Sequence, residues 1–193
     1  PLTKAPIFSL YGKTRKPTKK MMSNLDVMIF DIQDIGIRYY TYLSSLTLVM
    51  EVAAEENIPL IVLDRMNPLG RDIKGPILNM EFASFVGMHP IAVQHGMTIG
   101  ELAYMINEEG WLKNKLKVKL EVIKYEGKIR QKDRQNAFNV PPSPNMPDNK
   151  TAMNYVGLCL LEGTNLSEGR GTDSPFKVIG APWIDSDKLL DAM

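Results

Sequence analysis

The 193-residue chain has one cysteine, two histidines and a net charge of only +1. Because Cys159 is alone, no disulfide can form within the chain, and the apolar run at 156–161 around it predicts a buried, unreactive thiol. The near-zero net charge offers no basic footprint for nucleic acid. No apolar run reaches the roughly 20 residues that cross a bilayer, so we expect no membrane span.

Several common catalytic and cofactor motifs are also missing. The chain has no Gly-x-Ser-x-Gly elbow, no phosphate-binding Gly-x-x-x-x-Gly-Lys loop and no Gly-x-Gly-x-x-Gly dinucleotide fingerprint. His89 and His95 have the wrong spacing for a zinc-binding helix, and Cys159 has no partner thiol. We therefore expect no cofactor and no metal.

The apolar and charged fractions, 44% and 23%, are those of an ordinary globular protein, and the apolar pattern predicts an α/β fold. Short apolar runs at 25–30 and 58–63 are typical of parallel strands buried on both faces. The segment 42–57 between them has helical spacing, and Asn57 is suited to end that helix. A capping box predicts a second helix at 98–109, and alternation at 117–123 predicts a half-buried or edge strand.

Carboxylates follow three of the apolar runs, at Asp31, Asp64 and Glu162. Ligands of open α/β sheets bind at the carboxyl ends of strands, so these side chains could converge on one edge together with Gln33 and Asp34. The alternative is that they cap helices or accept main-chain hydrogen bonds. For each aspartate the two interpretations are about even, and the set as a whole favours a site.

Other candidates lie in loops that a rigid or glycine-rich backbone would hold open to a ligand. The segment 162–172 combines three glycines with two glutamates, an asparagine and an arginine, and the proline-rich loop at 136–149 is stiff enough to preorganise polar side chains. The candidates from these loops, from the turn after Asp64 and from the start of the helix at 98–109 are Arg65, Asn67, His95, Ser143, Asn145, Asn165, Glu168 and Arg170.

Taken together, the sequence blocks resemble one family, the NamZ-type exo-β-N-acetylmuramidases. The matching blocks run in order along essentially the whole chain, at 9–12, 17–18, 30–36, 38–42, 62–65, 67–68, 84–87, 95–103, 142–147, 161–172, 175–176 and 180–183. The resemblance implies a Rossmann-like fold with a largely parallel sheet. It also implies a glycoside hydrolase that releases N-acetylmuramic acid from non-reducing ends of peptidoglycan fragments, in cell-wall turnover and recycling.

The resemblance further implies that residues 1–193 are most of the N-terminal Rossmann-like catalytic domain, cut at both ends, with the C-terminal domain absent. The family's proposed catalytic glutamate lies in a Pro-Glu-His-Gly block that would precede residue 1. We therefore expect this chain alone to be inactive and its parent protein to be exported.

Within that framework we hypothesise roles for the candidates. We expect Glu162 and Glu168 to line the pocket together with Asp31 and Asp34. One of these could be the second carboxylate or could position water, and Glu162 and Glu168 are the catalytic candidates. Arginine would bind the lactyl carboxylate that distinguishes muramic acid from glucosamine. The remaining roles in binding muramyl saccharides fall to Gln33, Arg38, Asp64, Arg65, Asn67, His95, Ser143, Asn145, Asn165 and Arg170, of which Arg38, Arg65 and Arg170 are the lactyl candidates.

Two alternatives remain open from the sequence. One is a catalytically inactive glycan-binding fragment. The other is a metal-dependent hydrolase built on Asp31, Asp34, Asp64 and Glu162.

Overall fold

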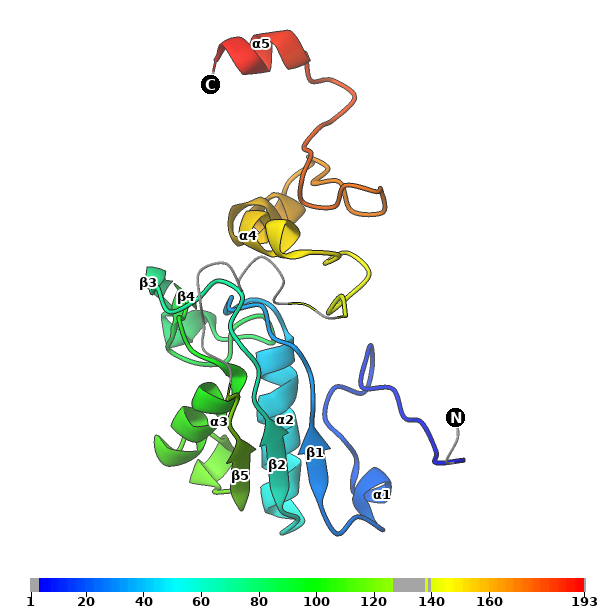
Figure 1. The fold of residues 1–193 in the computed structure, drawn as a ribbon, viewed down its shortest axis with the longest axis vertical. Helices are drawn as coiled ribbons and strands as arrows, with labels where there is room; N and C mark the ends of the chain where they lie inside the picture. Colours follow the sequence, from blue (N-terminus) through cyan, green and yellow to red (C-terminus); the bar gives the residue numbers. More distant parts are fainter. Residues whose placement is uncertain (1–3, 127–137, 139, 193) are drawn as a thin grey trace. The chain divides into compact units, whose positions relative to one another are not determined.

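The computed structural model describes residues 4–126, 138 and 140–192 (Figure 1). The chain divides into two units, Pro1–Lys128 and Ile129–Met193, and each is described by itself. None of the helices in the described ranges has the length and apolar character to span a bilayer.

Unit 1 contains a parallel sheet of three strands, which confirms the α/β class (Figure 1). The strands β1 (Met28–Phe30), β2 (Leu60–Leu63) and β5 (Leu120–Ile123) lie in the order β1-β2-β5. The register pairs Phe30 with Val62 and Val62 with Val122. The strand expected at 117–123 is therefore an edge of the sheet in the described part of unit 1.

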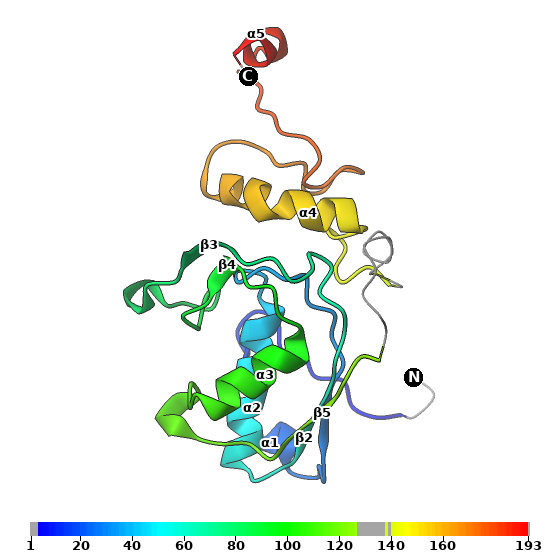
Figure 2. The same cartoon turned by 60° about the vertical axis from the view of Figure 1, so that its left-hand side comes forward.

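Two helices, α2 (Tyr42–Glu55) and α3 (Ile99–Glu108), cover one face of this sheet (Figure 2). Their apolar stripes pack against the inward side chains of the strands in one buried cluster. Each large apolar side chain buried there stabilises the fold by about 1.5–3 kcal/mol. Asn57, with a φ of 55°, follows the end of α2 in the left-handed conformation expected of it. The capping box of Thr98 and Glu101 opens α3, as the sequence predicts.

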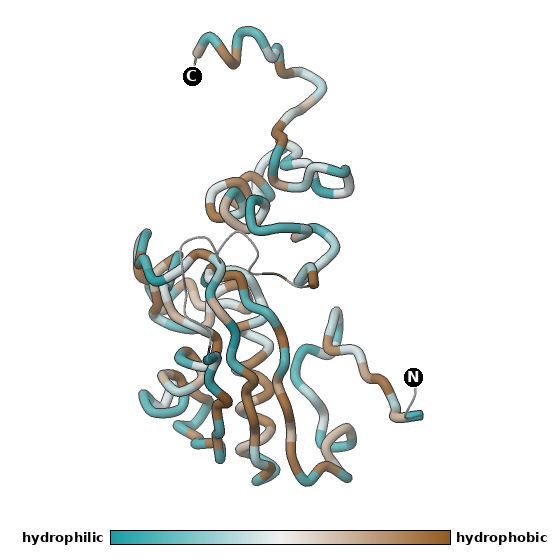
Figure 3. Tube along the Cα trace, in the orientation of Figure 1, coloured by the Kyte–Doolittle hydropathy of each residue, from teal (hydrophilic) through white to brown (hydrophobic). Residues whose placement is uncertain are grey.

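The opposite face of the sheet corrects the expectation that the strand at 25–30 is buried on both faces. Side chains alternate along a strand, so the neighbours of the core residues point away from α2 and α3. Among the described residues, Ile29 of β1 is 61% exposed, whereas the outward residues of β2 are half-buried. Ile123 of β5 is 48% exposed, which agrees with the half-buried or edge strand expected at 117–123. Figure 3 shows β1 and β2 in the hydrophobic colour along their whole length, so the continuous run of hydrophobic residues in these two strands did not indicate which face of the sheet is covered.

An antiparallel pair, β3 (Lys74–Ile77) and β4 (Ala92–Gln94), was not predicted. β3 contains Gly75 and Pro76 and is exposed along its length, so it shows neither the alternation nor the composition of a strand. The pair matters because β4 leads directly into His95. The remaining short elements of unit 1 are α1 (Lys19–Met22), η1 (Met80–Phe82) and η2 (Lys113–Lys115).

Unit 2 contains α4 (Asn149–Leu158), η4 (Cys159–Gly163) and α5 (Ser186–Asp191), with Asp148 and Asp185 as N-caps of the two α-helices. This arrangement corrects two expectations. Glu162 does not follow a strand, because α4 continues into the 3-10 helix η4 that contains it. Cys159 is only partly buried, because its helix is not enclosed on all sides by the described residues.

Candidate functional site

The loops that follow β1 and β2 meet at the carboxyl edge of the sheet through an ion pair. Asp31 comes directly after β1, and its Oδ1 accepts hydrogen bonds from Nε and Nη2 of Arg65, the former at 3.0 Å. The side chains of Asp31 and Arg65 are 46% and 39% exposed. The pair is therefore open to solvent at the edge where sheets of this class bind ligands.

Asp64 has a structural task at the same edge. Its Oδ2 accepts a hydrogen bond from Thr98 Oγ1 at 2.9 Å, and its Oδ1 accepts one from the Gly100 main-chain N–H at 2.8 Å. Both oxygens thus bind the first turn of α3, where unsatisfied N–H groups favour a carboxylate. This is the capping alternative that the sequence left open, although the helix concerned is α3, far along the chain.

Asp34 and His95 form a buried polar pair. Asp34 is 5% exposed and His95 is 3% exposed, and His95 Nε2 lies 3.5 Å from Asp34 Oδ2. The same Oδ2 accepts a hydrogen bond from the Gly36 N–H at 2.7 Å. Asp34 Oδ1 and His95 Nε2 have no hydrogen-bond partner within the standard distance among the described residues. Burial with unsatisfied polar atoms is costly, which marks the pair as a feature with a role beyond packing.

Main-chain contacts bring this pair together. An antiparallel bridge joins Ile37 to Gln94, and the His95 N–H donates to the Gly36 carbonyl at 3.4 Å. The segment at 36–37 therefore runs beside β4. This places Asp34, which precedes the segment, next to His95, which follows β4. Gly36 has a φ of +87°, which a residue with a side chain adopts only under strain.

Two amides connect the loops further. Asn67 Nδ2 donates to the Met97 carbonyl at 2.9 Å, and its Oδ1 accepts from the Leu69 N–H at 2.9 Å. Gln33 Nε2 donates to the carbonyls of Asp34 at 2.6 Å and Met66 at 3.1 Å. Six predicted residues, Asp31, Gln33, Asp34, Arg65, Asn67 and His95, thus lie in one set of interconnected loops.

The side chain of Arg38 binds main-chain carbonyls of unit 1. Its Nη1 donates to the carbonyls of Pro76 at 2.9 Å and Ile91 at 2.7 Å, which fastens the ends of the β3–β4 pair. Burial lowers the pKa of Arg38 below its usual value. With Nη1 bound to two carbonyls, Arg38 is less suited to a ligand carboxylate than the sequence implied.

In unit 2, Arg170 binds both predicted catalytic glutamates. Its Nη2 donates to Glu162 at 2.6 Å and its Nε donates to Glu168 at 3.2 Å. Its guanidinium carbon lies 5.2 Å from the ring centroid of Phe176. Burial opposes the positive charge, but the hydrogen bonds and charges of Glu162 and Glu168 outweigh it and raise the pKa of Arg170. Glu168 is buried, whereas Glu162 is exposed.

The other predicted residues of unit 2 lie in turns. The Ser143 carbonyl accepts a hydrogen bond from the Met146 N–H at 2.9 Å, so the proline-rich segment contains a tight turn with Asn145 inside it. Asn145 is half-buried and Asn165 is exposed. Residues 136, 137 and 139 of the predicted loop lie outside the described residues.

The four carboxylates of the metal-dependent alternative have separate partners. Asp31 binds Arg65, Asp34 binds the Gly36 N–H, Asp64 binds the start of α3, and Glu162 binds Arg170. Across residues 4–126, 138 and 140–192, no group of three or more His, Cys, Asp or Glu residues could hold a metal ion.

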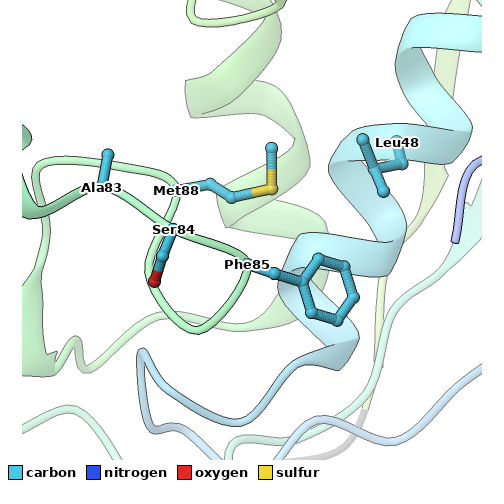
Figure 4. A pocket seen from close by; sticks show the side chains of 5 residues that line it. All are labelled: Leu48, Ala83, Ser84, Phe85 and Met88. Carbon is cyan, nitrogen blue, oxygen red and sulfur yellow. The ribbon is translucent and has the colours of Figure 1, made fainter. Parts of the chain in front are cut away.

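Two features were missed from the sequence. Tyr125 is 48% exposed and lies two residues beyond β5, where an aromatic ring could stack on a sugar. The sequence analysis looked for polar residues directly after the strands at 25–30 and 58–63. The same search after the strand at 117–123 would have found Tyr125. The second is a hollow of ≈ 330 Å³ lined by Leu48 of α2 and by the loop before β4, with Phe85 and Met88 reaching toward it (Figure 4). None of its lining residues is a predicted site residue, and it offers no carboxylate.

Comparisons with known proteins identify relatives along the whole chain. Residues 1–150 match the model described as "Exo-beta-N-acetylmuramidase NamZ, N-terminal", and residues 153–193 match its C-terminal counterpart. The two models divide the chain close to residue 151, whereas the sequence led us to assign all 193 residues to the N-terminal domain.

Among curated proteins, the peptidoglycan β-N-acetylmuramidase NamZ of Bacillus subtilis (strain 168) is 49% identical over 192 residues, which is 99% of this chain and 46% of the relative. Two crystal structures of DUF1343 family proteins from Bacteroides fragilis NCTC 9343 are also similar. One has a TM-score of 0.84 at 39% identity, covering 97% of this chain and 49% of that one. The other has a TM-score of 0.78 at 43% identity, covering 86% and 46%. The chain spans about half the length of each of these relatives.

Proposed function

The chain belongs to the NamZ exo-β-N-acetylmuramidase family, and we propose that the protein of which it is part releases N-acetylmuramic acid from the non-reducing ends of peptidoglycan fragments. The observation that carries this proposal is the near-complete alignment of the chain with the peptidoglycan β-N-acetylmuramidase of Bacillus subtilis. Because the chain spans less than half of that relative, the activity is proposed for the whole protein.

Unit 2 supports the proposal through its pair of glutamates. Glycoside hydrolysis usually requires two carboxyl groups about 5–10 Å apart on either side of the scissile bond. From the family resemblance we expect the main catalytic glutamate to lie outside this chain, and we propose that Glu162 or Glu168 supplies the second. Arg170 binds both side chains and so restricts where they lie, which a reaction that depends on a positioned acid or base requires.

Unit 1 supports it through the loops at the carboxyl edge of its sheet. The contacts of Gln33, Asp34, Asn67 and His95 hold these loops together, and the exposed pair of Asp31 and Arg65 faces solvent there. Carboxylates, amides and a guanidinium are the groups that bind sugar hydroxyls, an acetamido group and a carboxylate. For unit 2, we propose further contacts to muramyl saccharides from Ser143, Asn145 and Asn165.

The proposed substrate also sets the proposed location. Peptidoglycan fragments arise outside the cytoplasmic membrane, so the parent protein would act after export. Fractionation of cells that express the full-length protein would place it in the medium or periplasm if this is right.

The activity is tested with the full-length protein and two chromogenic glycosides, an N-acetylmuramide and an N-acetylglucosaminide. We expect release from the muramide only. Binding of N-acetylmuramic acid without turnover would instead support the glycan-binding alternative. Activity that chelators abolish and added metal restores would support the metal-dependent one.

A further inference from the structure

Three arginines were candidates for the lactyl carboxylate, and their contacts distinguish them. Arg38 uses Nη1 on two main-chain carbonyls, so part of its guanidinium serves the β3–β4 pair. Arg170 already faces two carboxylates, those of Glu162 and Glu168. A substrate carboxylate there would be a third negative charge around one cation.

Arg65 has the contacts of a residue that can bind one more anion. A single oxygen, Oδ1 of Asp31, accepts from its Nε and its Nη2. In the described ranges Asp31 is the only side chain bound to it, and a guanidinium carries five N–H donors. The terminal edge of the guanidinium, formed by Nη1 and the second N–H of Nη2, is therefore available for a two-pronged contact with a carboxylate.

The position of Arg65 agrees with such a role. It lies two residues beyond β2, the middle strand of the described sheet, and is 39% exposed. The register pairs Leu63 with Ile123, so Tyr125 lies the same two residues beyond β5. A guanidinium and an exposed aromatic ring thus follow neighbouring strands at the edge where ligands of α/β sheets bind.

We propose that Arg65 is the specificity-determining residue that binds the lactyl carboxylate of muramic acid, held in orientation by Asp31. This inference rests on the proposed function, because only a muramyl substrate carries that carboxylate. Asp31 and the substrate bind adjacent edges of one guanidinium, Asp31 at Nε and Nη2 and the substrate at Nη1 and Nη2. The enzyme thereby distinguishes muramic acid from N-acetylglucosamine by an ionic contact rather than by shape alone.

The test removes the charge from each side of the contact in turn. The full-length protein and its Arg65→Gln variant are assayed on a chromogenic N-acetylmuramide with a free lactyl carboxylate and on its lactyl methyl ester. We expect the unaltered enzyme to prefer the acid in kcat/KM by about 10–100-fold, the range of one charged hydrogen-bonded contact. In Arg65→Gln the ratio of acid to ester should fall to about one.

Arg71→Gln is the matched control, because Arg71 is another exposed arginine whose partner is a single carboxylate, that of Glu101. It should leave the acid-to-ester ratio unchanged. Arg65→Lys keeps the positive charge but loses the paired N–H donors of the guanidinium, so its acid-to-ester ratio should be intermediate. If Arg65→Gln does not fold, the ratio of Arg65→Lys is the test.

The possible failures are distinct. No cleavage of either substrate by the unaltered enzyme would overturn the proposed function, and this inference with it. Cleavage with a ratio that Arg65→Gln and Arg65→Lys both preserve would overturn the assignment of Arg65 alone. An equal loss on both substrates would also overturn it, since that result indicates a structural role.

Discussion

His95 directs its Nε2 toward Oδ2 of Asp34 across 3.5 Å, and neither residue is more than 5% exposed. The Met97 N–H donates to His95 Nδ1 at 3.2 Å, so in the neutral imidazole the hydrogen is on Nε2. His95 can then donate toward Asp34. One buried pair therefore joins the loop after β1 to the segment between β4 and α3.

Removal of the Asp34 carboxylate should destabilise this junction. We expect Asp34→Ala to lower the free energy of unfolding by about 1–3 kcal/mol, because the Gly36 N–H loses its buried acceptor and His95 loses its partner. Urea denaturation measures the change. Asp72→Ala is the control, since the Asp72 carboxylate is 62% exposed and Lys74 is its one ion-pair partner among the described residues. Equal small losses in both variants would contradict the role given to Asp34.

Gly36 should not tolerate a side chain. A Cβ at this position would overlap the side-chain amide of Asn67, and the φ of +87° is itself unfavourable to alanine. Gly12 has a similar φ of +90° but no atom within 4 Å of the added carbon, so Gly12→Ala carries the backbone strain alone. That strain is worth about 1–2 kcal/mol. Gly36→Ala should cost more than Gly12→Ala in the same denaturation assay, and an equal cost would show that Asn67 moves aside freely.

Asp64 should matter for stability more than for substrate binding. Asp64→Ala removes the acceptor of two donors at the start of α3, so we expect a loss of about 1–2 kcal/mol in the free energy of unfolding. The full-length variant, assayed well below its melting temperature, should keep kcat/KM for the muramide within about threefold. A stable but inactive Asp64→Ala would instead restore the substrate-binding role that the sequence suggested.

Buried His89 should make the stability depend on pH. Burial lowers the pKa of His89 from 6.5 to about 4, a shift that the charge of Glu51 partly opposes. The unfolded chain therefore binds more protons between these values. The stability from neutral His89 is present above the unfolded pKa and is lost as the pH falls toward the folded one. Between about pH 7 and about pH 4.5 this loss amounts to about 2–3 kcal/mol.

The His89→Gln variant isolates that contribution, because glutamine can still bond to Thr47, whose Oγ1 lies 2.8 Å from His89 Nε2. Denaturation of both proteins across this pH range should show a shallower decline in the variant. If the free energies of unfolding of the two proteins fall in parallel as the pH is lowered, protonation of His89 does not destabilise the folded chain.

The two glutamates bound to Arg170 can be separated by kinetics. If one of them is the second carboxylate, its change to glutamine in the full-length protein should lower kcat/KM by about 10²–10⁴-fold on a chromogenic muramide. Glu108→Gln is the control, because Glu108 is an exposed carboxylate paired with Lys117. Losses below about tenfold in both Glu162→Gln and Glu168→Gln would exclude a catalytic role for either.

Elements with a strong local signal were predicted correctly. The strands β1 and β2, the helices α2 and α3 and the capping box at Thr98 all depend on neighbours in the chain, whose periodicity and hydrogen-bonding groups are visible in the sequence. The β3–β4 pair was missed, because its stability depends on the main chain of Ile37 and on Arg38 rather than on its own composition.

The candidate site shows the same division. Residue types and strand ends sufficed to select Asp31, Asp34, Asp64, Arg65 and His95, because carboxyl ends of parallel strands gather at one edge. Which of them remain open to a ligand was not visible in the sequence. That depends on partners 30 or more residues away, such as Thr98 for Asp64 and Asp31 for Arg65, which only folding brings within hydrogen-bond distance.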